Sequence, residues 1–239
     1  MVGTIVNAIG IIIGSLIGLI FKNKLNSKVQ LGINNALGLG IIIIGLNGVV
    51  TNMITIVNNK ATSNGELLLV ISLAVGALIG EILRIDDKIN NFSNKIEKKF
   101  KLSNFSNGFV TSSIIFCVGA MGIIGAMNDG LTGDSSVLFI KSTLDFTTSI
   151  ILSASLGMGV LFSFVPILLY QGTISLLAGV LSTVLQGELL TQICFIGYTI
   201  IFAIGINFLF PNKIKTANLL PALLIPCLYS FFLYLKGLL

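Results

Sequence analysis

Long apolar segments, each close to twenty residues, constrain this chain more than any other feature. Eight of them follow one another, roughly at 3–21, 32–50, 66–84, 108–127, 139–164, 166–185, 192–210 and 219–237. A helix needs about 20 apolar residues to cross a bilayer and satisfies its own backbone hydrogen bonds there. A membrane barrel needs shorter strands of alternating polarity, which runs such as IIIGSLIGLIF lack. The sequence therefore predicts an all-α, polytopic membrane protein of about eight transmembrane helices, with residues 1–239 forming a single transmembrane domain in the lipid bilayer.

The composition supports this prediction and excludes several kinds of chemistry. Only 10% of the residues are charged, against about 25% in soluble domains. The chain has no histidine, and its three cysteines have no paired spacing, so histidine-based catalysis and the usual zinc sites are excluded and no metal or cofactor is expected. The net charge of +5 comes from loops between apolar segments. Anionic lipid head groups explain these loops better than nucleic acid does, because no basic face carries aromatic residues.

The basic residues also predict the orientation of the chain. They gather after the first, third and seventh apolar segments: Lys22, Lys24 and Lys28; Arg84, Lys88, Lys95, Lys98, Lys99 and Lys101; Lys213 and Lys215. With eight spans these loops share one side of the membrane, and the positive-inside rule makes that side the cytoplasm. The N-terminal segment lacks the basic start of a signal peptide, so we interpret it as the first span. We expect a multi-pass protein of the bacterial cytoplasmic membrane with both termini outside the cytoplasm.

The longest cytoplasmic loop, at about 85–106, has a pattern of its own. Apolar residues recur there at helical steps, at Ile85, Ile89, Phe92, Ile96 and Phe100. This spacing predicts an amphipathic helix lying on the membrane surface. A solvated linker helix is the alternative.

Glycines recur at helical spacing in two spans that resemble each other. GSLIGLIFK at residues 14–22 matches GALIGEILR at residues 76–84. An internal duplication of helix pairs, as in many transporters, explains the match, although glycine-rich composition alone is an alternative. Five glycines form small-residue stripes that allow close helix packing, within the chain or in a homodimer: Gly10, Gly14, Gly18, Gly76 and Gly80.

Two opposite charges, Lys141 and Asp145, lie inside the fifth apolar segment in FIKSTLDFTTS. If the membrane begins near Val137, Asp145 lies about 12 Å deep, at ~1.5 Å per residue, where an unpaired carboxylate costs about 2.5–3.5 kcal/mol. Lys141, one helical turn earlier, can pair with it. We expect both to face a polar cavity whose wall includes Thr148, Ser149 and Gln171. An interfacial salt bridge is the alternative.

The boundary between the fifth and sixth spans allows two interpretations. Only Phe164, Val165 and Pro166 separate the two apolar segments. They form either a tight hairpin or the unwound centre of one kinked segment.

Four further polar residues are candidates for a solute or ion pathway. Glu81, near the inner end of the third span, offers a cation or proton site, or else an ion pair with Arg84. Asn128 and Asp129 follow the fourth span and attract cations, or else form an ordinary turn. Asn207 lies four residues before Pro211 in the seventh span.

Several segments together resemble a known family. They are GTIVNAIGIIIGSLIG, SLAVGALIGEILRID, the stretch from FCVGAMGIIGAMNDG through FIKSTLDFTTSIILSASLGMGVLFS, Gln171-Gly172 and NLLPA. Over almost its whole length the chain resembles the domain-of-unknown-function 554 family of bacterial inner-membrane proteins. The resemblance implies a membrane transport function, with no assigned substrate and no assigned residues.

Secondary transport or conduction of a small polar or cationic solute is the function that these features favour. The chain lacks the GxxxxGK[ST] motif of ATP-driven motors, so any coupling must use an ion gradient or a partner. The alternatives are a structural or regulatory membrane subunit and, less favoured, an intramembrane enzyme acting on lipid. We do not expect an enzyme, since the one adjacent acidic pair, Asp86 and Asp87, lies in the basic loop.

Overall fold

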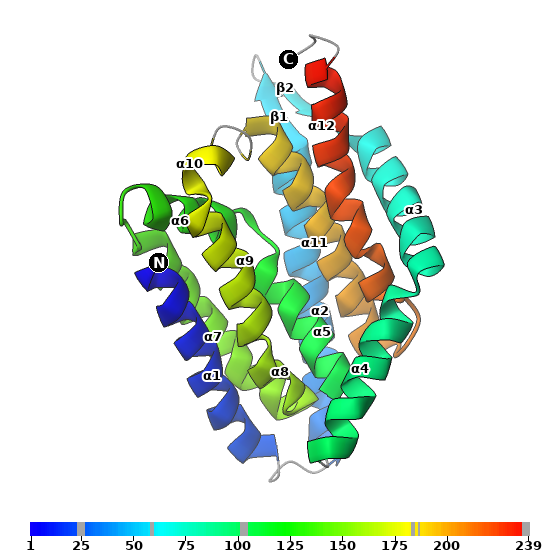
Figure 1. The fold of residues 1–239 in the computed structure, drawn as a ribbon. Coiled ribbons are helices and arrows are strands. Elements are labelled where there is room, and N and C mark those ends of the chain that lie inside the picture. The colour runs from blue at the N-terminus through cyan, green and yellow to red at the C-terminus, as the bar shows by residue number, and fades with distance from the viewer. Residues whose placement is uncertain (23–26, 58–59, 101–104, 183–184, 186, 236–239) are drawn as a thin grey trace. The chain divides into compact units, whose positions relative to one another are not determined.

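The computed structural model spans residues 1–239 and describes all of them except 23–26, 58–59, 101–104, 183–184, 186 and 236–239 (Figure 1). Its elements are α1 Val2–Lys22, α2 Ser27–Met53, β1 Ile54–Val57, β2 Lys60–Ser63, α3 Glu66–Leu83, α4 Ile85–Phe100, α5 Phe105–Cys117, α6 Ala120–Leu131, α7 Ser136–Leu156, α8 Gly159–Phe162, α9 Phe164–Leu176, α10 Ala178–Leu181, α11 Gly187–Leu209, the 3-10 helix η1 Thr216–Leu224 and α12 Ile225–Leu235. Among the described residues, seven helices are long and apolar enough to cross a membrane, and the number is eight if the bent pair α5 and α6 is counted as one span. The predicted membrane α-helical fold is confirmed.

The helices gather into two compact units, each built from two stretches of chain. Unit 1 comprises residues 1–34 and 89–185, and unit 2 comprises residues 35–88 and 186–239. Unit 1 therefore holds α1 and the helices from α5 to α10, while unit 2 holds most of α2 together with the β-hairpin, α3, α11, η1 and α12. That all 239 residues act as one transmembrane domain stays a prediction.

In unit 1, the glycine stripe of α1 packs directly on α7. A Cβ atom added at Gly14 would overlap the backbone carbonyl of Phe146, and one added at Gly18 would overlap that of Ile150. The Ser153 hydroxyl on α7 also donates to the backbone carbonyl of Ser15 at 2.9 Å. Small residues thus bring the two backbones together. Later residues of α1 contact later residues of α7, so the two helices run parallel (Figure 1).

Unit 2 uses glycines in the same way but with antiparallel partners. A Cβ added at Gly76 on α3 would overlap Ala222 of η1, and one at Gly80 would overlap Asn218. On α2, the glycines meet α11 in reverse order, with Gly38 against Leu209, Gly45 against Phe202 and Gly48 against Tyr198.

These packing directions bear on the number of membrane crossings. Helices that cross in succession alternate in direction, so parallel packing of α1 and α7 requires an odd number of crossings between them. The helices α2 and α3 supply two, and the bent pair α5 and α6 supplies the third. The antiparallel packing of α3 with η1, and of α2 with α11, also requires that the pair α5 and α6 crosses the membrane once. Each pairing therefore agrees with eight crossings and disagrees with seven.

The fourth span is broken where the sequence predicts a continuous helix at 108–127. The pair α5 and α6 bends by 63° between Cys117 and Met121. Gly119 at the break has φ 122 and ψ 148, a backbone conformation that other residues rarely adopt. A polar or water-lined surrounding is normally required for such a break inside a membrane.

The junction between the fifth and sixth spans lies earlier than predicted. Helix α7 ends at Leu156, and Gly157 turns the chain with φ 87 before α8 begins at Gly159. Pro166 lies inside the first turn of α9. Backbone N–H groups there have no partner within the helix, so the missing N–H of proline costs no hydrogen bond. The predicted boundary at 164–166 is therefore wrong, because glycine makes this turn and the proline continues a helix.

Two local structures were not expected from the sequence. A β-hairpin pairs Ile54 with Ser63 and Thr55 with Thr62 between α2 and α3. The last span begins as the 3-10 helix η1, which contains Pro221.

The predicted amphipathic segment forms a helix, α4. It begins with Asp86 and Asp87 and ends with Lys98 and Lys99, and this arrangement complements the helix dipole. The side chain of Asn218 accepts a hydrogen bond from the backbone N–H of Asp86 at 2.8 Å. The side chains of Phe92, Ile96 and Phe100 lie outside the described residues, so binding of α4 to the membrane surface stays a prediction.

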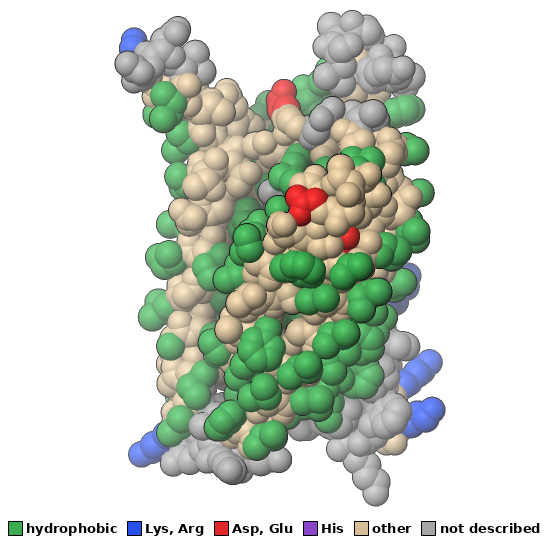
Figure 2. All heavy atoms as spheres, turned by 90° about the vertical axis from the view of Figure 1, so that its left-hand side faces the viewer, with side chains coloured by type: hydrophobic (Ala, Val, Ile, Leu, Met, Phe, Trp, Pro, Cys, Tyr) green, Lys and Arg blue, Asp and Glu red, His purple; other side chains and the backbone are tan. Residues whose placement is uncertain are grey.

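Large apolar side chains are exposed along the spans, as a protein solvated by lipid requires. On α1 they include Val2, Ile5, Ile9, Ile13, Leu16 and Ile20. Figure 2 shows the side of the molecule on which α1 lies. Hydrophobic side chains cover the middle of this face, and acidic side chains are seen in the upper part of the face. Exposing this much apolar surface to water would be costly.

Candidate functional site

Lys141 and Asp145 lie buried in the interior of α7 and form an ion pair. Their relative exposures are 6% and 7%, and the Lys141 ammonium donates to Oδ2 of Asp145. Asp145 is nine residues after Ser136, the first residue of α7, which is about 14 Å along the helix. The structure therefore places the two charges inside unit 1.

Asn7 of α1 connects this ion pair to a third helix. Its Nδ2 donates to Oδ2 of Asp145 at 3.0 Å and to Oε1 of Gln171, on α9, at 3.3 Å. Asn7 and Gln171 are fully buried. We call Asn7, Lys141, Asp145 and Gln171 the polar cluster. It joins α1, α7 and α9 inside unit 1.

The broken fourth span lies against the polar cluster. A Cβ added at Gly122, in the first turn of α6, would meet Cε of Lys141 at 3.4 Å and Nε2 of Gln171 at 3.7 Å. The break between α5 and α6 thus occurs beside the buried charges.

Two polar atoms of the cluster have no hydrogen-bond partner among the described residues. They are Oδ1 of Asn7, an acceptor, and Nε2 of Gln171, a donor. An unsatisfied buried polar group costs about 1–3 kcal/mol. A water molecule or a small polar solute beside the cluster would satisfy such groups.

Stability alone is a poor explanation for the ion pair. Replacing a buried pair by apolar residues of similar size is often neutral or stabilising, by up to about 4 kcal/mol. Ionisable residues inside membrane spans generally mark pathways for ions, protons or substrates. The cluster combines such residues with unsatisfied amides and a broken helix.

Of the predicted cavity wall, Gln171 joins the cluster and two hydroxyl residues do not. Ser149 donates to the carbonyl of Phe146 at 2.8 Å and packs against Gly14, at the contact between α1 and α7. Thr148 is half-buried on α7 and makes no hydrogen bond to the cluster among the described residues.

Asn128 and Asp129 lie inside α6, not in a turn after the fourth span as the sequence allowed, and Asp129 contacts the start of α1. Asp129 accepts hydrogen bonds from the backbone N–H of Gly3 at 3.2 Å and from the Ser135 hydroxyl at 2.7 Å, and lies 3.1 Å from the nitrogen of Met1. The carbonyl of Asn128 accepts a bond from Thr132. Both carboxylate oxygens of Asp129 are thus engaged within the chain.

Glu81 and Asn207 belong to unit 2, separate from the cluster. Glu81 pairs at 3.5 Å with Lys215, not with the expected neighbour Arg84, and both side chains of the pair are more than half exposed. Asn207 closes a turn, because its amide donates to the carbonyl of Ile214 at 2.7 Å and accepts from the N–H of Ile214 at 3.0 Å.

The sequence reasoning missed Asn7, which lies at the centre of the site. A buried amide in an otherwise apolar span is unusual enough to be a signal. Asn7 is also part of GTIVNAIGIIIGSLIG, one of the segments that carry the family resemblance. Its partners on α7 and α9 are more than 130 residues away, at separations of 138 and 164, so spacing alone does not reveal them.

Comparison with known proteins gives relatives over the full length of the chain. It is 33% identical over 238 residues to "Uncharacterized membrane protein YdfK" of Bacillus subtilis strain 168, covering 100% of this chain and 99% of that protein. It is 29% identical over 232 residues to "Uncharacterized protein YqgA" of Escherichia coli strain K12, covering 94% of each. No solved structure matches. Residues 2–231 match the family described as "Protein of unknown function (DUF554)", and the chain therefore belongs to this family of membrane proteins.

Proposed function

We propose that this protein is a secondary transporter or channel for a small polar or cationic solute in the bacterial cytoplasmic membrane. The observation that carries the proposal is the ion pair of Lys141 and Asp145, buried inside membrane-spanning helices beside the break between α5 and α6. Broken helices next to a polar centre are typical of the binding sites of secondary transporters. In this proposal the protein moves its solute without covalent chemistry.

The polar cluster supplies a mechanism for binding and release. Lys141 neutralises Asp145 while the site is empty. A cation, or a proton, then competes with Lys141 for the carboxylate. Burial disfavours the charged carboxylate, whereas the ammonium beside it favours the charge. The site is thus balanced between two states that solute or proton binding shifts.

The two amides give the site its selectivity for polar solutes. Asn7 already donates to both Asp145 and Gln171, and its own oxygen has no donor among the described residues. A solute at the cluster would meet this acceptor together with the amide nitrogen of Gln171. A Cβ at Gly122 would touch both Lys141 and Gln171, so this glycine keeps the backbone of α6 close to the cluster.

The same contacts favour a second function, that of a structural or regulatory membrane subunit. Asn7 ties α1 to α7 and α9, and polar side chains also serve as glue between membrane helices. In that case the pair holds helices together and moves nothing. The two functions make different predictions for a variant that removes both charges at once.

The deciding experiment compares Asp145→Asn, Lys141→Met and the double variant in proteoliposomes. An internal pH-sensitive dye and imposed proton, sodium or potassium gradients report ion flux. We expect wild-type flux to fall at least tenfold in Asp145→Asn and in the double variant. The double variant leaves no unpaired buried charge, so it should fold as stably as the wild type. Its loss of flux would then reflect the missing carboxylate.

Asp134 offers a matched control. It lies between α6 and α7, is exposed, and accepts a hydrogen bond from the N–H of Ser136 at 3.0 Å. Hydrogen bonds from the side chain and then the backbone of Ser136 lower the pKa of Asp134, so it is charged at neutral pH. Asp134→Asn should leave flux unchanged. Wild-type flux in the double variant, or no flux in the wild type under any of the three gradients, would contradict ion-coupled transport through Asp145.

A further inference from the structure

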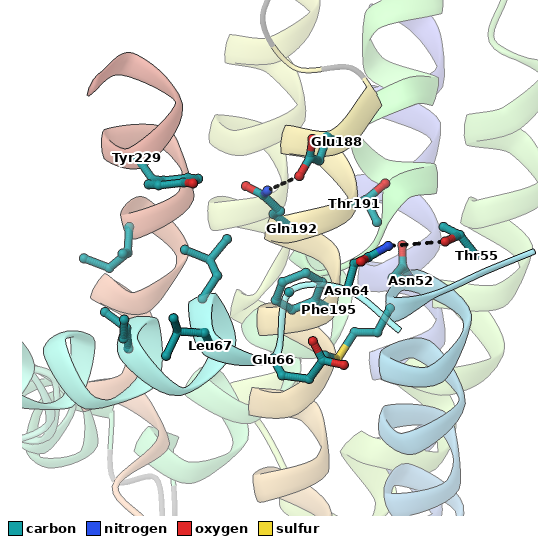
Figure 3. A pocket seen from close by; sticks show the side chains of 15 residues that line it. Asn52, Thr55, Asn64, Glu66, Leu67, Glu188, Thr191, Gln192, Phe195 and Tyr229 are labelled. Carbon is teal, nitrogen blue, oxygen red and sulfur yellow. Dashed lines mark hydrogen bonds between the residues drawn. The ribbon is translucent and has the colours of Figure 1, made fainter. Parts of the chain in front are cut away.

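Unit 2 contains a pocket of about 860 Å³ that is separate from the polar cluster (Figure 3). It lies where α2 ends, α3 begins and α11 begins, and α12 closes one side. The lining residues fall into a polar and an apolar group. The polar group comprises Asn52, Thr55, Asn64, Glu66, Glu188, Thr191 and Gln192, and the apolar wall includes Met53, Leu67, Leu68, Ile71, Phe195 and Ile225, with Tyr229 beside it.

The charge of the pocket has a single sign. Glu66 and Glu188 contribute carboxylates, and the described residues that line the pocket include no lysine or arginine. Phe195 and Tyr229 add two aromatic rings, whose faces attract cations. The lining therefore disfavours anions and favours a positively charged occupant with an apolar body.

Gln192 provides an independent sign that the pocket is built for a hydrogen-bond donor. The residue is 93% buried, since its relative exposure is 7%, and its side chain projects from α11 into the pocket (Figure 3). Its Nε2 donates to Oε1 of Glu188 at 3.0 Å. Its Oε1 has no donor among the described residues. The bond to Glu188 fixes the amide, so its oxygen needs a donor from elsewhere.

The neighbouring polar groups do not supply that donor. The Thr191 hydroxyl donates to the carbonyl of Gly187 at 3.0 Å. The Asn64 amide donates to the Thr55 hydroxyl at 3.4 Å. An occupant of the pocket is therefore the natural source of a hydrogen-bond donor for Gln192.

We propose that this pocket binds an organic cation that carries N–H donors on an apolar body, a primary alkyl- or arylammonium. The ammonium donates to Oε1 of Gln192 and is balanced by Glu188 and Glu66, while its hydrocarbon packs on the apolar wall. The ammonium belongs either to a free amine or to the head group of phosphatidylethanolamine. The proposal does not depend on transport through Asp145, because every lining residue belongs to unit 2.

Binding of 2-phenylethylammonium to the full chain in phosphatidylcholine nanodiscs tests the proposal. Two matched probes accompany it. Trimethyl(2-phenylethyl)ammonium keeps the charge but lacks N–H donors, and 3-phenylpropionate reverses the charge. Equilibrium dialysis should show saturable binding of the primary ammonium. Its Kd should be at least about tenfold lower than that of the trimethyl probe, since a hydrogen bond to a charged group is lost. The carboxylate should not bind.

Variants assign the binding to this pocket. Gln192→Met removes the acceptor at nearly constant size, and Glu188→Gln removes a charge while leaving an acceptor for Gln192. Each should raise the Kd about tenfold or more. Glu81→Gln is the control, because Glu81 is an exposed carboxylate of the same unit that does not line the pocket. It should leave the Kd unchanged, and thermal unfolding should show that all three variants are folded.

The source of the ammonium follows from a second set of nanodiscs. Adding phosphatidylethanolamine should leave binding unchanged if the natural ligand is a free amine, and should compete with the probe if it is the lipid. Either result supports the shared chemistry. No saturable binding in phosphatidylcholine, equal binding of the trimethyl probe, or an unchanged Kd in Gln192→Met would overturn it.

Discussion

At the scale of single residues, Asn7 gives the buried carboxylate of Asp145 a neutral hydrogen-bond donor in addition to Lys141. Its amide is fully buried and reaches Asp145 and Gln171 from a different helix. A hydrogen bond to a charged group contributes about 1.5–3 kcal/mol. The pair on α7 is local, four residues apart, whereas Asn7 makes it part of the tertiary structure.

We therefore expect Asn7→Leu to destabilise the protein by about 1–3 kcal/mol, because Asp145 loses a donor and the oxygen of Gln171 loses its partner. Reversible unfolding in mixed micelles, followed by circular dichroism, measures the change. Thr143→Val is the control, since the Thr143 hydroxyl is exposed and donates to the carbonyl of Phe139 in its own helix. Equal stability of the two variants would mean that the Asn7 contacts contribute nothing to stability.

At the scale of elements, glycine has two different uses that the sequence does not distinguish. Gly14 and Gly18 have no side chain, so the backbone of α1 packs directly against α7. Gly119 and Gly157 instead adopt positive φ values and break or turn the chain. Both kinds lie in apolar runs with similar neighbours, and only the packed structure determines which use applies.

Gly18→Ala should destabilise unit 1 by about 1–3 kcal/mol, because a Cβ there overlaps the carbonyl of Ile150 and the backbone cannot move aside without separating the helices. Gly40→Ala on α2 is the matched control. A Cβ there meets nothing within 4 Å, so the gain in helix propensity, up to about 1 kcal/mol, should leave stability equal or higher. The same unfolding assay compares them, and a loss in Gly40→Ala as large as in Gly18→Ala would contradict this account of the stripe.

The spans could be predicted from the sequence because crossing a membrane depends on local length and polarity. The break at Gly119 could not, since Gly119 lies in an apolar run like the glycines that continue a helix, and only its positive φ in the structure distinguishes it. The β-hairpin was missed because its strands, ITIV and KATS, are too short to show a pattern beside such long helices. Half of the polar cluster, Lys141 and Asp145, was evident as charge in an apolar run. Gln171 was expected near this pair because it follows Pro166 in the next span. Asn7 could be identified only from the folded structure.

At the scale of the whole molecule, the glycine stripe no longer argues for a homodimer. Gly10, Gly14 and Gly18 are occupied by α7 of the same chain, so they are not available to a second copy. Association into a homodimer stays a prediction without support from this surface. Gly14→Leu should consequently lower the stability of the monomer, and light scattering of detergent-solubilised protein would show whether any dimer persists in it.

The last prediction concerns orientation, where the bent pair α5 and α6 is decisive. If it crosses once, Asp134 lies outside the cytoplasm and Lys213 inside, with Lys60 outside and Lys88 inside. If it returns to its own side, Asp134 moves inside and Lys213 outside, but Lys60 and Lys88 do not change. The parallel packing of α1 with α7 and the antiparallel packing of α2 with α11 require the first arrangement.

Single cysteines at these four positions, in a chain whose own cysteines are replaced by serine, separate the two arrangements. A membrane-impermeant thiol reagent applied to whole cells should label Lys60→Cys and Asp134→Cys directly, and Lys88→Cys and Lys213→Cys only after permeabilisation. Lys60 and Lys88 serve as internal controls because both arrangements place them alike. Labelling of Lys213→Cys in intact cells, with Asp134→Cys protected, would mean that the bent pair does not cross. The parallel contact between α1 and α7, on which the geometry of the polar cluster depends, would then be impossible in a membrane.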